Sequence, residues 1–159
     1  MKEEMSRIVR TMTTLIYVFI MVYGFYVIAH GHLTPGGGFQ GGSVVASAFA
    51  LLVVTYGNQK TQDFLQKDLL SLLESTGLVI FICFAFFGLG ATFFYNFLSN
   101  SGSLFGSSAT IGVNPGNLNT GGTVTAMNIA VGIEVLAALG VIVLTMSQAS
   151  ETIEKKEKE

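Results

Sequence analysis

The stretch that decides the fold is residues 125–146, TAMNIAVGIEVLAALGVIVLTM, in which Glu134 is the only charged residue. An apolar run of about 20 residues can cross the hydrocarbon core of a bilayer as a helix. Three further stretches, 8–29, 41–57 and 71–97, are similarly long and apolar. Backbone polar groups in lipid must be satisfied within the segment, which favours helices. The sequence therefore predicts an all-α, polytopic membrane protein with four transmembrane helices, in which residues 1–159 form a single membrane domain.

Composition supports this class. Half of the 159 residues are hydrophobic and 11% are charged, whereas soluble domains are about 25% charged. The net charge of −2 gives no reason to expect a nucleic-acid partner. Cys83 is the single cysteine, which excludes an internal disulfide and a thiolate metal site. We expect no cofactor and no metal. The C-terminal tail, residues 150–159, mixes both charge signs, which is typical of a solvated helix end.

The positions of lysine and arginine predict the orientation. These residues gather before the first span, between the second and third, and after the fourth, whereas the loops at 30–40 and 98–124 hold none. Cytoplasmic loops carry the excess of positive charge. Both termini are therefore predicted to be cytoplasmic. The positions concerned are Lys2, Arg7, Arg10, Lys60, Lys67, Lys155, Lys156 and Lys158.

The two uncharged loops resemble each other. PGGGFQGGSV begins at Pro35, and PGNLNTGGTV begins at Pro115. Each pattern predicts a Pro-Gly turn followed by a Gly-Gly-Ser/Thr helix start, whose hydroxyl can cap the first turn. Small residues continue at a spacing of four, which lets membrane helices approach closely. We therefore hypothesise a tandem repeat of a two-helix hairpin, with ridges formed by Gly42, Ala46, Ala50, Gly122, Ala126 and Ala130.

Glu134 is the most informative single residue, because an ionisable group deep in a span is costly and marks a functional site by default. It continues the spacing of Ala126 and Ala130, so it is expected to face a helix contact. Three interpretations are open. The carboxylate pairs with a cation of another chain, or it is protonated and neutral, or it lies on an ion path.

Three other residues are candidates for the same ion path or inter-subunit charge pair. Glu74 ends the pattern Ser71-Leu-Leu-Glu74, which is typical of a capping box at the start of the third helix. His30 and His32 lie where the first helix leaves the membrane, and histidine titrates near neutral pH. The competing interpretation of both histidines is an ordinary interfacial role, since two histidines are a weak metal signal.

The segment 31–42, GHLTPGGGFQGG, is too rich in glycine for an ordinary helix. No Lys-Ser/Thr follows the glycines, so a phosphate loop is excluded. We predict a tight turn buried against another subunit, with Phe39 as its anchor. The loop comprises Thr34, Pro35, Gly36, Gly37, Gly38, Phe39, Gly41 and Gly42. No arrangement of residues supports an enzyme.

At residues 31–51, GHLTPGGGFQGGSVVASAFAL, the sequence resembles the MnhB/MrpB family, the B-type components of the bacterial multisubunit Mrp/Mnh-type Na+/H+ antiporters. The Leu-Leu-Glu at 72–74 and the pair Asn128 and Glu134 agree with the same family. The motif positions are His32, Pro35, Phe39 and the surrounding glycines.

The resemblance implies a non-catalytic subunit of a hetero-oligomeric antiporter in the bacterial cell membrane, driven by the proton motive force. It implies partners of the A, C, D, E, F and G type, and Na+ and H+ as transported ions. The subunit would be needed for assembly of the complex and for pH and Na+ homeostasis. Two other hypotheses are a self-assembling small cation channel, with Glu134 lining its pore, and a purely structural scaffold.

Overall fold

The computed structural model describes residues 5–108 and 117–156. These residues form helices and connecting segments, with no strand among them. Four helices are long and apolar enough to cross a membrane, which confirms the predicted all-α class and its four spans. The helices are α1 (Arg7–Ala29), α2 (Gly37–Tyr56), α3 (Asn58–Phe64), α4 (Lys67–Phe87) and α5 (Thr123–Lys156), with short 3-10 turns at Gly88–Gly90 and Leu118–Thr120.

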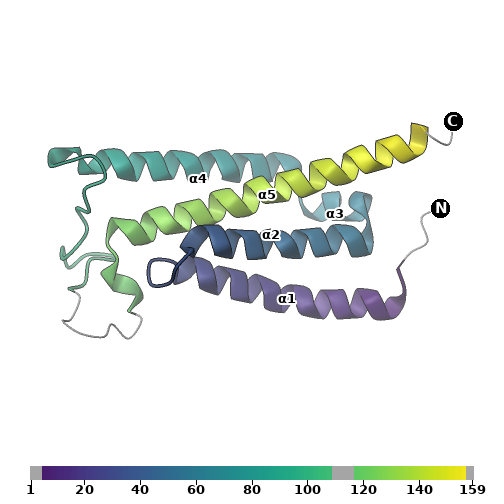
Figure 1. Cartoon of the computed structure of the whole chain (residues 1–159), viewed down its shortest axis with the longest axis horizontal. Coiled ribbons are helices and arrows are strands. Elements are labelled where there is room, and N and C mark those ends of the chain that lie inside the picture. Colours follow the sequence, from purple (N-terminus) through teal and green to yellow (C-terminus); the bar gives the residue numbers. More distant parts are fainter. Residues whose placement is uncertain (1–4, 109–116, 157–159) are drawn as a thin grey trace.

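The four long helices lie side by side in the order α1, α2, α5, α4 (Figure 1). The helices α2 and α5 are therefore central, and α1 and α4 flank them. The start of α1 and the end of α5 lie at one end of the bundle together with α3, and we call this the terminal end. The loop at 30–36 and the described residues between α4 and α5, 88–108 and 117–122, lie at the other end, the loop end.

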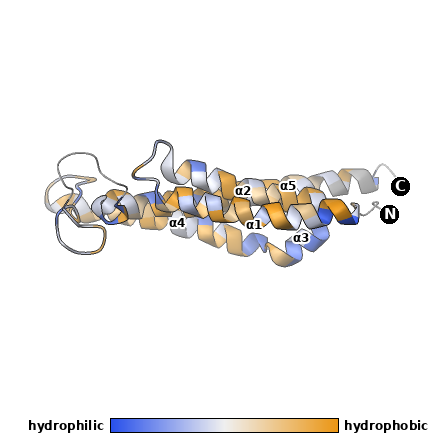
Figure 2. Ribbon diagram, turned by 90° about the horizontal axis from the view of Figure 1, so that it is seen from below, coloured by the Kyte–Doolittle hydropathy of each residue, from blue (hydrophilic) through white to orange (hydrophobic). Residues whose placement is uncertain are grey.

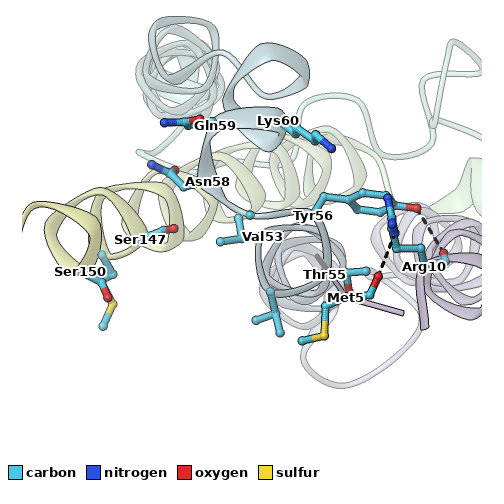
Figure 3. A pocket seen from close by; sticks show the side chains of 13 residues that line it. Met5, Arg10, Val53, Thr55, Tyr56, Asn58, Gln59, Lys60, Ser147 and Ser150 are labelled. Atoms are coloured by element: carbon cyan, nitrogen blue, oxygen red, sulfur yellow. Dashed lines mark hydrogen bonds between the residues drawn. The ribbon is translucent and has the colours of Figure 1, made fainter. Parts of the chain in front are cut away.

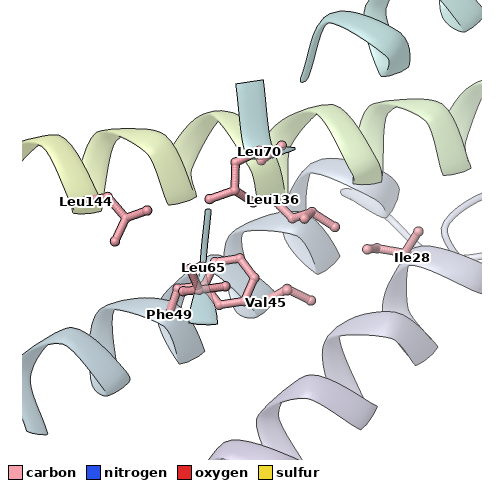
Figure 4. Packing of buried hydrophobic residues seen from close by; sticks show 8 residues of the cluster. Ile28, Val45, Phe49, Leu65, Leu70, Leu136 and Leu144 are labelled. Atoms are coloured by element: carbon pink, nitrogen blue, oxygen red, sulfur yellow. The ribbon is translucent and has the colours of Figure 1, made fainter. Parts of the chain in front are cut away.

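The hydrophobic core lies between the two central helices. Val45 and Phe49 of α2 meet Leu136 and Leu144 of α5, and all four are buried (Figure 4). The flanking helices expose large apolar side chains instead, and Phe19 is 67% and Phe87 is 68% exposed. Hydrophobic residues extend along the length of the bundle in Figure 2. An apolar exterior of this kind is suited to lipid rather than to water.

Glycine brings the backbones of the central helices into contact. A Cβ atom at Gly42 would lie 2.9 Å from the carbonyl oxygen of Gly132 and 3.0 Å from the amide nitrogen of Leu136. At Gly77 of α4, a Cβ atom would lie 2.9 Å from the carbonyl oxygen of Ala130. Small residues at helix crossings are the usual means of close packing in membranes, where van der Waals contact drives association.

The second helix begins earlier than predicted. The segment 37–42 is the first part of α2, so the prediction that this glycine-rich stretch is non-helical was wrong. Glycine costs about 1 kcal/mol per residue in a helix relative to alanine. Here the absence of side chains at Gly38 and Gly42 allows contact with α5, which offsets that cost.

The third helix also differs from the predicted range 71–97, because α4 begins at Lys67 and ends at Phe87. The predicted capping box at Ser71 was wrong, since Gln66 is the N-cap and Ser71 lies inside the helix. After the helix the chain turns back, and the amide of Phe94 donates to the carbonyl of Ala85 at 3.2 Å. The apolar residues beyond Phe87 therefore pack on the end of α4 instead of extending it.

The fourth span was predicted as 125–146, but α5 continues to Lys156 as one helix. The tail is helical as far as that residue, and residues 157–159 lie outside the described part of the chain. The first span, 8–29, was correct to within one residue.

Two successive helix hairpins, α1–α2 and α4–α5, would produce the observed helix order if they were related by an axis along the bundle. The predicted hydroxyl caps were wrong. Ser43 lies inside α2, where its hydroxyl donates to the carbonyl of Phe39, and the Thr123 hydroxyl donates to the side chain of Asn96. Pro115 and Gly116 lie outside the described residues. The duplication stays a hypothesis, and superposition of α1–α2 on α4–α5 tests it.

We predict that Gly42→Val lowers the free energy of unfolding by about 1–3 kcal/mol, because overpacking forces the central helices apart. The measurement is thermal unfolding of the purified protein in detergent. Gly90→Val is the matched control, since nothing lies within 4 Å of a Cβ atom there. Equal losses in the two variants would contradict the assigned contact.

Candidate functional site

The side chain of Asn128 joins three helices at the loop end. Its Nδ2 donates to the carbonyl oxygen of Ile28 at 2.7 Å, and its Oδ1 accepts from the amide of Gly38 at 2.6 Å. The first carbonyl lies in the last turn of α1 and the amide lies in the first turn of α2. The amide of Gly38 has no partner within its own helix, whereas the Ile28 carbonyl also accepts from the Gly31 amide at 3.2 Å. One amide side chain of α5 thus satisfies a helix end on each side of the 30–36 loop.

The glycines of the loop leave room for this side chain. Cβ atoms at Gly31, Gly37 and Gly38 would each collide with Asn128. The backbone of Gly36 (φ 89°) and Gly37 (φ 40°) is in the left-handed region that favours glycine. The glycine run of the motif is thereby explained by close contact with α5 and by a left-handed turn.

The predicted loop residues divide into two groups. Gly37, Gly38, Gly41 and Gly42 are buried, whereas Thr34, Pro35, Gly36 and Phe39 are at least partly exposed. The exposed fraction of Phe39 is 61%, so this ring contacts little of its own chain. Its predicted role as an anchor for another subunit stays a prediction.

A second asparagine organises the start of α5. Asn96 Oδ1 accepts from the amide of Thr123 at 2.8 Å and from its hydroxyl at 2.9 Å. Asn96 Nδ2 donates to the carbonyl of Gly121 at 3.2 Å. Asn96 thus caps α5 from a distant part of the chain. Sequence reasoning missed this residue, because nothing local in the sequence pairs it with Thr123.

The two predicted histidines have different surroundings at the loop end. His30 follows α1, with Nδ1 at 3.0 Å from the carbonyl oxygen of Tyr26 and its ring centroid 4.0 Å from that of Tyr26. His32 packs against Gly121. Among the described residues no group of three histidine, cysteine or acidic residues could hold a metal ion.

Both ring nitrogens of His32 are buried, and neither forms a hydrogen bond within the described part of the chain. Burial lowers the pKa of His32 from its ordinary value, and this is the largest effect. The backbone of Asn117 raises the pKa in part, and the neighbouring His30 lowers it by a lesser amount. The neutral imidazole is therefore the form that fits between the 30–36 loop and the start of α5.

Glu134 lies where α5 crosses α4. A Cβ atom at Gly77 would lie 3.0 Å from Glu134 Cβ and from its amide nitrogen. Glu134 is half-buried, and within the described residues its carboxylate forms no hydrogen bond or ion pair. Glu74 lies one turn from Gly77 on α4 and is also half-buried. The structure places no cation of the described chain against either carboxylate, and their roles stay predictions.

The predicted ridges face different neighbours. Ala46 of α2 and Ala130 of α5 are buried, and Ala50 and Ala126 are half-buried. The carbonyl of Ala130 lies against Gly77 of α4, whereas the α2 glycines lie against the other side of α5. The helix α5 is therefore packed on both faces.

Four apolar helices with backbones in contact define a polytopic α-helical membrane protein. Residues 8–141 match the family model described as "Domain related to MnhB subunit of Na+/H+ antiporter". The match covers most of the chain, and the protein belongs to this MnhB family.

Two relatives illustrate the relationship. "Uncharacterized protein MJ1307" of Methanocaldococcus jannaschii is 32% identical over 154 residues, which are 96% of this chain and 56% of the relative. "Putative antiporter subunit mnhB2" of Staphylococcus aureus is 36% identical over 66 residues, which are 42% of this chain and 47% of the relative. The chain spans about half the length of the curated relatives it matches.

We predict that Asn128→Ala leaves the Gly38 amide without its side-chain partner, at a cost of about 1–3 kcal/mol, whereas the Ile28 carbonyl still accepts from the Gly31 amide at 3.2 Å. Thermal unfolding measures the loss, and hydrogen exchange at the Gly38 amide localises it. Gln59→Ala is the control, because Gln59 is an exposed amide residue at the opposite end. Unchanged exchange at Gly38 would contradict the assignment.

We predict that stability at the loop end falls as the pH drops below the ordinary histidine pKa of about 6.5. The pKa of folded His32 is lowered, so the unfolded state binds its proton first as the pH falls. The stabilisation is present above about pH 6.5 and is lost progressively below it. Unfolding temperatures between about pH 5 and 8 should depend less on pH in His32→Gln. An identical pH dependence in the wild type and the variant would refute this role.

Proposed function

We propose that this chain is the B-type, non-catalytic subunit of a hetero-oligomeric monovalent cation/proton antiporter driven by the proton motive force. The observation that carries the proposal is the match of residues 8–141 to the MnhB family model. The name of the staphylococcal relative, an antiporter subunit, supports it. The partners would be subunits of the A, C, D, E, F and G type, and the transported ions would be Na+ and H+.

Glu134 gives the proposal a physical basis. A charged side chain near the middle of a membrane helix costs about 2.5–3.5 kcal/mol and is retained where it pairs or conducts. The described part of the chain offers it no cation. We propose that its counterpart is a cation of a neighbouring subunit or an ion on the transport path. Either alternative requires that the α4–α5 crossing face another subunit or a water-filled space.

We propose that the terminal end faces the cytoplasm. Arg7, Arg10, Lys60 and Lys67 lie at this end. The described segments at the loop end contain no lysine or arginine. The asymmetry supports the predicted orientation through the positive-inside rule.

The experiment is Glu134→Gln in the intact antiporter complex. We expect Na+/H+ antiport in everted membrane vesicles to fall about tenfold or more, because the ionisable group at the α4–α5 crossing is removed. Asp63→Asn is the matched control, since Asp63 is an exposed carboxylate of α3 at the terminal end. Complex assembly is measured in parallel by co-purification of the other subunits.

The two measurements distinguish the alternatives. Loss of assembly in Glu134→Gln identifies an inter-subunit charge pair, and loss of antiport in an intact complex identifies an ion path. Wild-type assembly and antiport would refute a role for the carboxylate. Failure of the wild-type chain to co-purify with any other membrane subunit would overturn the proposed function itself.

A further inference from the structure

Three buried polar atoms without hydrogen bonds lie together at the loop end. They are the two ring nitrogens of His32 and the hydroxyl oxygen of Thr125, and no other described residue has such an atom. Thr125 is 1% exposed. Both side chains contact Gly121, because a Cβ atom there would lie 2.7 Å from His32 Cδ2 and would collide with Thr125 Oγ1. Buried polar side chains are hydrogen-bonded in the large majority of cases, so this cluster needs an explanation.

The cavity at the terminal end differs in this respect. Its volume is about 680 Å³, and Arg10 and Tyr56 are among the residues that line it. Both are bonded within the chain (Figure 3). Arg10 Nε donates to the carbonyl of Met5 at 3.1 Å, and the Tyr56 hydroxyl donates to the carbonyl of Arg10 at 3.2 Å. Within the described chain, the buried groups without partners are therefore confined to the loop end.

The side chains of His32 and Thr125 are chemically matched. The ring atom nearest to Gly121 is Cδ2, and a half-turn of the ring about its bond to Cβ exchanges Cδ2 with Nδ1. A neutral imidazole has one nitrogen that accepts a hydrogen bond, and the Thr125 hydroxyl can donate to it. In the imidazolium form both nitrogens donate, so the hydroxyl can only accept and its own proton needs another acceptor. The pair therefore suits the neutral ring better than the protonated one.

The sequence places no charged side chain in the segments that meet at His32. Positions 11–59 and 75–133 contain no Asp, Glu, Lys or Arg. Glu134 lies nine residues beyond Thr125 in α5, which is about 14 Å along the helix axis. A protonated His32 would therefore be a buried charge without a counter-ion from these segments, which is costly.

The other titratable and polar neighbours act on His32 more weakly. His30 is on the same loop, and its charge opposes protonation of His32, whereas the backbone of Asn117 favours protonation in part. The tyrosines near this end, Tyr26 and Tyr95, titrate near pH 10. Burial is the largest effect and lowers the pKa of His32. The two histidines are thus the groups of these segments that can change charge between about pH 5 and 8.

We propose that His32 forms a pH-sensitive contact: the neutral ring pairs with the Thr125 hydroxyl and holds the 30–36 loop against the start of α5, and protonation releases the loop. Figure 1 shows this loop near the start of α5. The contact is separate from the bonds of Asn128, which join α1 and α2 to α5. Protonation should therefore loosen residues 30–36 and 117–122 while the four long helices stay packed.

The test is hydrogen exchange of the full chain in detergent between about pH 5 and 8, with each rate divided by the rate of an unstructured peptide at the same pH. We expect constant protection of residues 30–36 above about pH 6.5, the ordinary histidine pKa. Below it, protection should fall by up to tenfold per pH unit, because the released loop binds one more proton. Protection in the middle of α2 and α5 should not follow this fall. Constant protection of the loop over the whole range would overturn the proposal.

Variants identify the two partners. His32→Gln should abolish the pH dependence, and His30→Gln, the matched control, should retain it. Thr125→Val should lower the protection of residues 30–36 about fivefold at pH 7.5, as expected for the loss of one hydrogen bond. Thr92→Val is its control, because Thr92 is an exposed threonine at the same end.

A pH dependence that persists in His32→Gln, or that disappears equally in His30→Gln, would overturn the assignment to His32. Wild-type protection in Thr125→Val would overturn the pairing with Thr125. The wild-type profile tests the pH-sensitive contact even where a variant does not fold. The readout involves neither antiport nor another subunit, so its outcome is independent of the proposed function.

Discussion

Contact between helix backbones at glycine positions is the constraint on which the rest of the structure depends. Asn128 makes this constraint specific, because it hydrogen-bonds at once to the Ile28 carbonyl and to the Gly38 amide. Both bonds require α1, α2 and α5 to meet within a few ångströms. That distance is available only because Gly31, Gly37 and Gly38 carry no side chains. The loop between α1 and α2 is thus fixed by a residue nearly a hundred positions away in the sequence.

The two faces of α5 pack against different helices. One face meets α2 and α1 through Gly132, which lies against Ile28, and the other meets α4 at Ala130 and Glu134. The Cβ atom and backbone of Glu134 therefore lie at a tightly packed crossing of α4 and α5. The side chain is half-buried, and an ionisable group within an apolar span is a functional candidate for this reason.

The number of spans could be predicted from the sequence because hydrophobic length alone decides it. The residues at which several helices begin or end could not be predicted in this way. Gly37 begins α2 because tertiary contact with Asn128 outweighs the poor helix propensity of glycine. The helix α4 ends at Phe87 although apolar residues follow. The chain folds back there, and the amide of Phe94 donates a hydrogen bond to the carbonyl of Ala85. Glu134 was recognisable as a charge within an apolar run. Asn96 was not, since its contact with Thr123 depends on residues brought together only by the fold.

The two ends of the bundle offer different surfaces to their surroundings. At the loop end, the polar side chains of Asn96, Asn119 and Asn128 bond within the chain. Among the described residues there, Phe39 and Phe93 are large apolar groups that are 61% and 51% exposed. Within the described residues, these asparagines thus use their amides inside the chain, while Arg7, Arg10, Lys60 and Lys67 belong to the segments at the terminal end. The two ends of the bundle therefore differ in charge, which is the kind of asymmetry that the positive-inside rule relates to orientation in a membrane.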